Sequence, residues 1–431
     1  MARMSDPVCV GQRHGPYFFA SVGGRGSGTG GYQVFGRGCG NFDQPGCTIP
    51  AEKMGGPGDP FEWTEFGATG MSDVTTLRSI MDESELWPTG SSPVWGWHKA
   101  DGGNPFLSWQ GKAFYHEVFL PSPRAGGGDR GSFMDLAQEV HASQWLQAEG
   151  YRYTFQAARR RKWHRSAMAM WTFNEPWPNA VHGSILDYRG RPKHAYWWVK
   201  QAMAMLDVSL EYYSLVHVAD GHTSHAVALW VDSELATPSP ACCVHLEHFY
   251  VNGTMAAPTE VHALPGGAVA PARATRLGAV RTQLPSASVG EVVLARVSLL
   301  DVDGTTVRAR HTYAFSFVGH GVNTSAVEAP LHSMLTAPSA QLSLSATRQG
   351  SSVALSVLAS AAAAHYVELT LCDAAGTKLP FVTVTQNLMT MLPGEHVDAT
   401  ATVLWDGGLA GTAWQACAEA WNAKRACVSL Q

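Results

Sequence analysis

The stretch Phe61-Glu62-Trp63-Thr64-Glu65-Phe66-Gly67 decides the fold of the first half of the chain. This short run of mainly large apolar side chains predicts a buried strand that ends close to the carboxylate of Glu65. Gly67 allows the backbone to turn sharply directly afterwards. A helix is expected next, over residues 73–81, with Ser72 as its capping residue. The stretch thus predicts a strand–helix unit with an acidic residue at the end of the strand.

The same order of elements returns further along the chain. Apolar side chains at helical spacing predict helices over residues 133–147, 151–163 and 193–205. Residues 167–173 predict another short apolar strand. Strands that alternate with helices and carry polar side chains at their carboxyl ends are typical of a (β/α)8 TIM barrel. Two strand–helix units make only part of such a barrel, so residues 1–206 are interpreted as its C-terminal part.

Beyond residue 206 the pattern of the sequence changes. Alternating Val, Ala, Leu, Thr and Ser residues predict short strands separated by turns, for example at 291–299 and 352–358. Short alternating strands of this kind favour Ig-like β-sandwich domains. The expected fold class is therefore α/β plus all-β, with the barrel part followed by one sandwich over residues 207–320 and a second over residues 321–431.

Composition and charge exclude several functional classes. The chain of 431 residues is 45% hydrophobic and 15% charged, with a net charge of −5, which is typical of a folded protein. Its one basic run, Arg159 to Lys162, is too short to follow a nucleic acid backbone. There is no apolar run of membrane-spanning length. The eight cysteines form no C-x-x-C pair, so a zinc ribbon is not expected, and we predict neither a metal nor a cofactor.

Tryptophan is unusually frequent, with 15 residues, most of them before residue 231. Indole rings pack protein cores, but they also stack on the apolar faces of sugars. In Trp171-Thr172-Phe173-Asn174-Glu175-Pro176-Trp177, a polar pair stands between indoles at the end of a predicted strand. The segment is equally consistent with a sugar subsite and with a packed turn. Glu65 alone is weak evidence, because the chain has 35 acidic residues.

A family resemblance strengthens this interpretation. Trp63-Thr64-Glu65-Phe66-Gly67 and Asp187-Tyr188-Arg189-Gly190-Arg191-Pro192-Lys193 are two of the segments that resemble, in order, β-mannosidases of glycoside hydrolase family 2. The full set of matching segments is 63–67, 83–88, 97–99, 143–150, 160–163, 171–178, 187–193, 386–389 and 392–395. Each match is moderate, and their common order is the stronger signal.

The resemblance implies roles for particular residues. Glu65 matches the nucleophile of a retaining glycosidase and would lie on the seventh strand of the barrel. The segment 171–177 would form the eighth strand and its loop. The residues expected to contact the substrate sugar are Trp171, Asn174, Glu175, Trp177 and Trp97.

A retaining glycosidase needs a second carboxyl group about 5 Å from the nucleophile. In this family the acid/base lies in an Asn-Glu element before the nucleophile, and the 64 residues before Glu65 contain no Asn-Glu pair. Glu175 is therefore interpreted as a binding residue, and the acid/base is expected to be absent from this chain. With barrel strands one to five also missing, and residues 14–18 as strand six or its loop, the chain is expected to be a fragment that needs its N-terminal half.

The expected activity is hydrolysis of terminal β-linked mannose, or a similar sugar, in oligosaccharides or glycoprotein glycans. Exo-β-glucosaminidase or endo-β-mannosidase activity of the same family remains open, as does a non-catalytic carbohydrate-binding or degenerate protein. The sequons at Asn252 and Asn323 lean weakly towards a lysosomal, vacuolar or secreted location. Cys39 and Cys47 are equally consistent with a small disulfide and with buried thiols.

Overall fold

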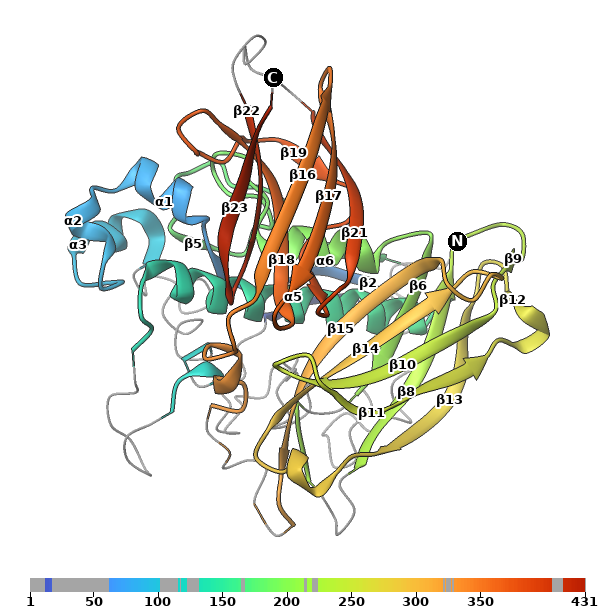
Figure 1. The fold of residues 1–431 in the computed structure, drawn as a ribbon. Coiled ribbons are helices and arrows are strands. Elements are labelled where there is room, and N and C mark those ends of the chain that lie inside the picture. Colours follow the sequence, from blue (N-terminus) through green and yellow to red (C-terminus); the bar gives the residue numbers. More distant parts are fainter. Residues whose placement is uncertain are drawn as a thin grey trace, which may run out of the picture.

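The structure is a computed structural model that describes residues 12–17, 62–100, 115–116, 118–121, 132–163, 167–212, 215–218, 224–320, 322, 327, 329–404 and 414–430. Cys39 and Cys47 lie outside these residues. The described chain consists of a small parallel sheet with helices, followed by two β-sandwiches (Figure 1). The expected fold class, the end of a TIM barrel with two sandwiches after it, is confirmed.

Three strands form the parallel sheet. They are β1 (Gln12–Tyr17), β2 (Glu62–Gly67) and β4 (Ala167–Met170), in the spatial order β1-β2-β4. Both pairings are parallel. Parallel neighbours require connections that cross from one end of the sheet to the other, as in a barrel. A strand near residues 14–18 was one of the two alternatives predicted there, and β1 confirms it.

Helices cover this sheet and continue away from it. They are α1 (Val74–Ile80), α2 (Glu83–Leu86), α3 (Pro93–Trp95), the π-helix η3 (Gly96–Ala100), α5 (Leu136–Arg160) and α6 (His194–Ala202). The predicted cap of α1 was wrong by one residue. Asp73 caps the helix, since its Oδ1 accepts a hydrogen bond from Thr75 N at 2.7 Å. Ser72 instead donates its hydroxyl to Asn179 O at 2.7 Å.

The prediction of two helices over residues 133–163 was also wrong. A single helix, α5, runs through Gly150 for 25 residues. Glycine within a helix costs only about 1 kcal/mol relative to alanine. Packing outweighs this cost, because Glu149 pairs with Arg152 and most of the helix is buried. The helix was predicted as two pieces because local spacing does not register contacts made with distant parts of the chain.

The first sandwich follows α6. One sheet has the order β11-β10-β14-β15-β7 and the other β13-β8-β6, with the short pair β12-β9 beside them. Its elements are β6 (Leu206–Glu211), β7 (Val216–Val218), β8 (Ser224–Ser233), β9 (Ser239–Pro240), β10 (Cys243–Tyr250), β11 (Met255–Ala263), η4 (Pro265–Gly267), β12 (Ala268–Val269), β13 (Ala274–Gln283), η5 (Ser286–Ser288), β14 (Val292–Leu300) and β15 (Val307–Val318).

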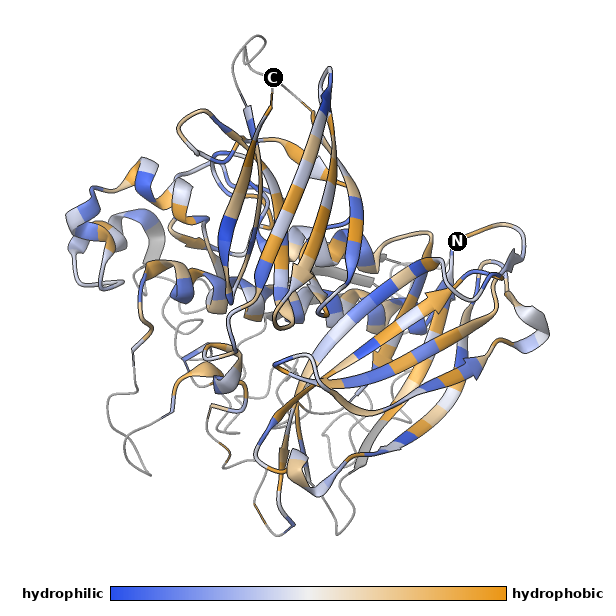
Figure 2. Ribbon diagram, viewed as in Figure 1, coloured by the Kyte–Doolittle hydropathy of each residue, from blue (hydrophilic) through white to orange (hydrophobic). Residues whose placement is uncertain are grey.

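The second sandwich consists of two four-stranded sheets, β16-β17-β21-β19 and β20-β18-β22-β23. Along β16, partly buried apolar side chains alternate with exposed polar ones, and the hydropathy colours of this strand form bands in Figure 2. The elements are η7 (His332–Met334), β16 (Gln341–Gln349), β17 (Ser352–Ser360), β18 (Ala364–Asp373), β19 (Val382–Val384), β20 (Met389–Met391), β21 (His396–Val403), β22 (Trp414–Ala420) and β23 (Ala423–Leu430). A disulfide joins Cys417 to Cys427 across β22 and β23.

Helix α5 contacts both sandwiches, which lie on different sides of it in Figure 1. Arg152 donates from Nη1 to Thr312 O in the first sandwich at 2.8 Å. Trp145 donates from Nε1 to the hydroxyl of Tyr366 in the second sandwich at 2.8 Å. No helix in the described part of the chain is long and apolar enough to cross a membrane.

Candidate active-site edge of the parallel sheet

The register of the parallel sheet brings the two predicted site segments to one edge. Phe66 on β2 pairs with Met170, the last residue of β4. Glu65 and Trp171 are the neighbours of this pair in the sequence, so both stand at the carboxyl ends of adjacent parallel strands. Catalytic residues of TIM barrels lie at this edge. The two segments, which are separated by 104 residues from Gly67 to Trp171, thus belong to one location.

The backbones of the two segments approach each other closely. A Cβ atom on Gly67 would lie 2.7 Å from Trp171 O, and one on Gly183 would lie 2.6 Å from the same oxygen. Backbone atoms cannot yield to such a contact as a flexible side chain can. Glycine is therefore required at both positions by space. The close approach to Trp171 O explains the glycine at position 67. From the sequence alone, that glycine was attributed to a turn.

The loops that leave β2 and β4 are fastened to each other and to α5. Short strands β3 (Gly70–Met71) and β5 (Val181–His182) pair in antiparallel fashion. The amide of Gln147 donates to Ala68 O at 2.9 Å and to Ser184 O at 3.0 Å. The Tyr151 hydroxyl donates to Gly183 O at 2.6 Å. Helix α5 therefore holds both loops at the edge, which accounts for the polar residues of segment 143–150.

Exposed aromatic side chains gather beside this edge. Trp97 on η3 is 70% exposed and Trp177 is 45% exposed, and their ring centroids lie 6.4 Å apart with the rings edge to face. The ring of His98 lies 2.7 Å from Pro178 O, so it ties the two segments together. Contiguous exposed apolar patches rimmed by polar residues are a feature of ligand-binding grooves. The structure brings these two predicted residues together.

Two further predicted residues lie in the same loop. Asn174 is exposed, and Trp171 is partly buried with its ring 5.7 Å from that of His182. Sequence reasoning missed Phe173, which is 52% exposed between them. Its place between Trp171 and Asn174 in the quoted segment was the available signal.

Glu175 is buried, whereas its sequence neighbours Asn174 and Pro176 are exposed. Its carboxylate accepts a hydrogen bond from Lys193 Nζ at 2.7 Å, and Ser184 donates to the same oxygen. Neither side chain of the Glu175–Lys193 pair has exposed surface. Burial raises the pKa of Glu175 above its ordinary value, although Lys193 and Ser184 oppose that change. In this structure the Glu175 carboxylate contacts Lys193 and Ser184 of its own chain, and the predicted contact with a sugar stays a prediction.

The segment 187–193 supplies the lysine of this pair. Asp187 Oδ1 accepts hydrogen bonds from Arg189 N and Arg191 N, both at 3.0 Å, which closes a tight turn. Gly190 occupies this turn with φ of +74°, a conformation that favours glycine. Lys193 then also donates to Gly70 O at 3.1 Å. The turn thus fixes the lysine that holds both loops of the edge.

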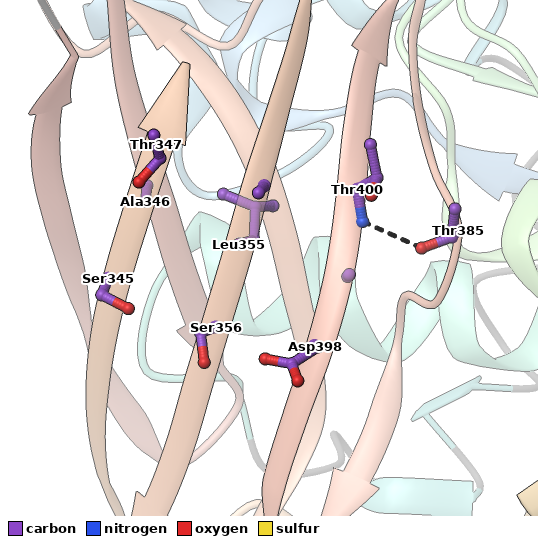
Figure 3. A pocket seen from close by; sticks show the side chains of 10 residues that line it. Ser345, Ala346, Thr347, Leu355, Ser356, Thr385, Asp398 and Thr400 are labelled. Atoms are coloured by element: carbon purple, nitrogen blue, oxygen red, sulfur yellow. Dashed lines mark hydrogen bonds between the residues drawn. The ribbon is translucent and has the colours of Figure 1, made fainter. Parts of the chain in front are cut away.

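A separate hollow lies on the outer face of the second sandwich (Figure 3). It has a volume of about 320 Å³ and is lined by small side chains of β16, β17 and β21, such as Ser345 and Thr400. Thr400 N donates to Thr385 Oγ1 there at 2.9 Å. It shares no residue with the edge of the parallel sheet. The described residues contain no cluster of His, Cys, Asp or Glu that would hold a metal ion.

Comparisons with known proteins give a consistent picture of the fold. No family model and no curated protein matches the sequence. Among solved structures, the exo-chitosanase CsxA of Amycolatopsis orientalis matches 86% of this chain with a TM-score of 0.65 and 17% identity. A β-D-mannosidase from Dictyoglomus thermophilum matches 84% with a TM-score of 0.59 and 18% identity. The chain spans less than half the length of either enzyme, 43% and 37% respectively.

Both structures match most of this chain in fold at 17% and 18% sequence identity. The fold similarity agrees with the ordered segments of the sequence, from Trp63–Gly67 to the terminal sandwich. The chain therefore has the β-mannosidase-like fold of glycoside hydrolase family 2.

Proposed function

We propose that this chain is the nucleophile-bearing part of a retaining β-glycosidase that removes terminal β-linked mannose, or a similar sugar, from oligosaccharides or glycoprotein glycans. The observation that carries the proposal is the position of Glu65 at the carboxyl edge of β2, directly beside the end of β4. Exposed Trp97 and Trp177 near this edge provide surfaces on which a sugar ring can stack.

In the proposed reaction the Glu65 carboxylate attacks the anomeric carbon, and the bond to the leaving oxygen breaks. A second carboxyl group donates a proton to that oxygen and later activates water. Glu175 is unsuited to this role, because it is buried and paired with Lys193. The family resemblance implies an acid/base in an Asn-Glu element, and no Asn-Glu pair precedes Glu65 in this sequence, so we propose that a further segment supplies the proton donor and that activity requires it.

The sugar itself can be mannose or glucosamine. One matched enzyme is named as a β-mannosidase, and the other is an exo-chitosanase whose structure was determined with a β-D-glucosamine derivative. Exo-β-glucosaminidase activity is therefore the second candidate. Turnover of p-nitrophenyl β-mannoside and p-nitrophenyl β-glucosaminide, each assayed with the N-terminal part of the enzyme supplied, decides between them.

Covalent labelling tests the role of Glu65 directly. A 2-deoxy-2-fluoro-β-mannosyl fluoride needs no proton donor, because fluoride leaves with its electron pair unassisted. The Glu65 oxygen forms the new bond to the anomeric carbon as the carbon–fluorine bond breaks. We expect the added sugar mass on the peptide that contains Glu65, and no added mass in Glu65→Gln. A label on another carboxylate, or no label when the N-terminal part is supplied, contradicts the proposal.

A further inference from the structure

The hairpin between β10 and β11 carries one of the two sequons, Asn252-Gly253-Thr254. Gly253 N donates to Tyr250 O at 2.8 Å, and Tyr250 N donates to Thr254 O at 2.9 Å, so the sequon forms a tight turn. Asn252 and Thr254 are both exposed on this turn. Asn323, the asparagine of the other sequon, lies outside the described residues. Of the two, Asn252 is thus the one whose surroundings the structure describes.

The side chain of Asn252 has a defined orientation. Its Oδ1 accepts a hydrogen bond from Thr254 N at 2.8 Å and a second one from the Thr254 hydroxyl, and these two bonds form an Asx turn. The amide nitrogen Nδ2 is the other branch of the same group, and it has no hydrogen-bond partner within the described part of the chain. An N-linked sugar is attached through this nitrogen. The attachment atom therefore belongs to an exposed side chain and is not held by another described residue.

The backbone of the turn packs against the second sandwich, and the side chain of Asn252 stays exposed. Ala363 N donates to Asn252 O at 3.2 Å, and a Cβ atom on Gly253 would lie 2.8 Å from Pro393 Cδ. Strand β11, which follows the turn, is the outermost strand of its sheet, so the hairpin lies at the edge of the first sandwich. A bulky group on Nδ2 can therefore extend into solvent without displacing the contact between the two sandwiches.

An independent feature agrees with a compartment in which N-glycans are added. Cys417 and Cys427 form a disulfide in the second sandwich. Disulfides persist in oxidising surroundings such as the lumen of the endoplasmic reticulum, and exposed sequons are acceptors of N-glycans in secreted proteins. We propose that Asn252 carries an N-linked glycan.

The transfer step forms one bond and breaks another. Asn252 Nδ2 bonds to the anomeric carbon of the first sugar of an oligosaccharide linked to a polyprenyl diphosphate. The bond from that carbon to the phosphate oxygen breaks, and the polyprenyl diphosphate leaves with the electron pair. The amide proton passes to solvent.

Peptide mapping of the full 431-residue chain tests this inference. A cleavable leader directs the chain into the endoplasmic reticulum of a eukaryotic cell line, and the chain is isolated from the whole cell extract and digested with trypsin. Cleavage after Lys and Arg leaves Asn252 in peptide 201–273 and Asn323 in peptide 311–348. We expect the mass of a glycan on peptide 201–273. Peptide N-glycosidase should release it from the folded chain without denaturant, because the Asn252 side chain is exposed.

Three variants define the acceptor. Asn252→Asp keeps an oxygen that accepts from Thr254 but lacks the amide nitrogen, so it should lose the glycan and keep the circular dichroism spectrum of wild type. Thr254→Ala should also lose the glycan, because the sequon is destroyed. Asn323→Gln is the matched control, and it should leave the glycan on peptide 201–273 unchanged.

Removal of the leader shows that the chain entered the lumen, and the disulfide reports its oxidation there. Cys417 and Cys427 join peptides 379–424 and 426–431 in a digest without reductant. An unmodified peptide 201–273 overturns the inference, whether those two peptides are joined or separate, as does a glycan on peptide 311–348 alone. A glycan that the glycosidase releases only from the unfolded chain contradicts the exposed position of Asn252. None of these results depends on whether Glu65 is labelled by the fluoro sugar.

Discussion

A buried lysine between three acids should make the stability of the second sandwich depend on pH. Lys378 Nζ lies 3.0 Å from Asp73 Oδ2, 2.9 Å from Glu368 Oε2 and 2.8 Å from Glu419 Oε1. Asp73 caps α1, whereas Lys378 belongs to the second sandwich, so the group joins the barrel part to that domain. One positive charge cannot balance three negative ones. The perturbation of interest is Glu368→Gln, which removes one acid and keeps its shape.

The magnitude follows from the pKa of Glu368. Burial raises this pKa from 4.5 to about 7, and repulsion from Glu419 and Asp73 adds to the rise although Lys378 opposes it. A carboxyl group with a raised pKa binds its proton more tightly in the folded state. Its stabilising contribution is therefore complete below pH 4.5 and is lost as the pH rises through 7. Between pH 5 and pH 8 the loss amounts to about 2–3 kcal/mol.

Urea unfolding at pH 5 and pH 8, followed by tryptophan fluorescence, measures this contribution. Relative to wild type, Glu368→Gln should gain about 2–3 kcal/mol between pH 5 and pH 8, since it no longer loses a proton. Other titrating groups, such as Asp232 with a burial-raised pKa of about 7 and His365 with a burial-lowered pKa of about 4, cancel in the difference. The exposed Glu291→Gln is the control. Parallel pH dependences of Glu368→Gln and wild type would refute the reasoning.

Three further substitutions test individual contacts. Lys193→Met leaves Glu175 buried without its cation, and we expect urea unfolding to report a loss of about 3–5 kcal/mol. Gly190→Ala places a Cβ 2.6 Å from the Phe381 ring at φ of +74°, so it should cost about 2–4 kcal/mol in the same assay. Arg296→Met removes the guanidinium that pairs with carboxylates of both sandwiches, and should destabilise by about 2–5 kcal/mol and speed proteolysis between them.

Matched controls separate these effects from general ones. Gly304→Ala carries the backbone cost alone, because Gly304 has φ of +69° and open space around its Cβ position. It should cost about 1–2 kcal/mol, and a loss equal to that of Gly190→Ala would show that the Phe381 contact is unimportant. Arg308→Met removes a partly exposed pair with Asp301 and should cost at most about 1 kcal/mol. A similar cost for Arg296→Met would exclude a linking role for that arginine.

Sequence reasoning succeeded where a local pattern determines the structure. The strand at Glu62–Gly67 followed from its apolar run, and the strand at Ala167–Met170 from its length and the proline beyond it. The choice between Ser72 and Asp73 as the cap of α1 was not decidable locally, since both side chains suit that position. Asp73 takes it, and Lys378, 305 residues away, binds its other oxygen.

Reasoning failed where distant contacts decide the outcome. The length of α5 depends on partners such as Tyr366, which lies 221 residues from Trp145. Glu175 is buried beside Lys193, a residue of segment 187–193 to which the family resemblance assigned no role. A carboxylate between two tryptophans is a sensible sugar ligand until a lysine is known to stand behind it. An ion pair between two loops, such as Glu175 with Lys193, can be recognised only once the three-dimensional positions of the loops are known.

Helix α5 has a consequence for how the protein can be divided. Its residues contact the parallel sheet loops through Gln147, the first sandwich through Arg152 and the second through Trp145. Cutting the chain at residue 206 would remove α5, against which both sandwiches pack. It would also expose Tyr212 and Tyr366, whose side chains are at most 3% exposed in the intact chain. The helix thus connects all three parts of the structure. The sandwiches are expected to fold in one cooperative step with it rather than as independent domains.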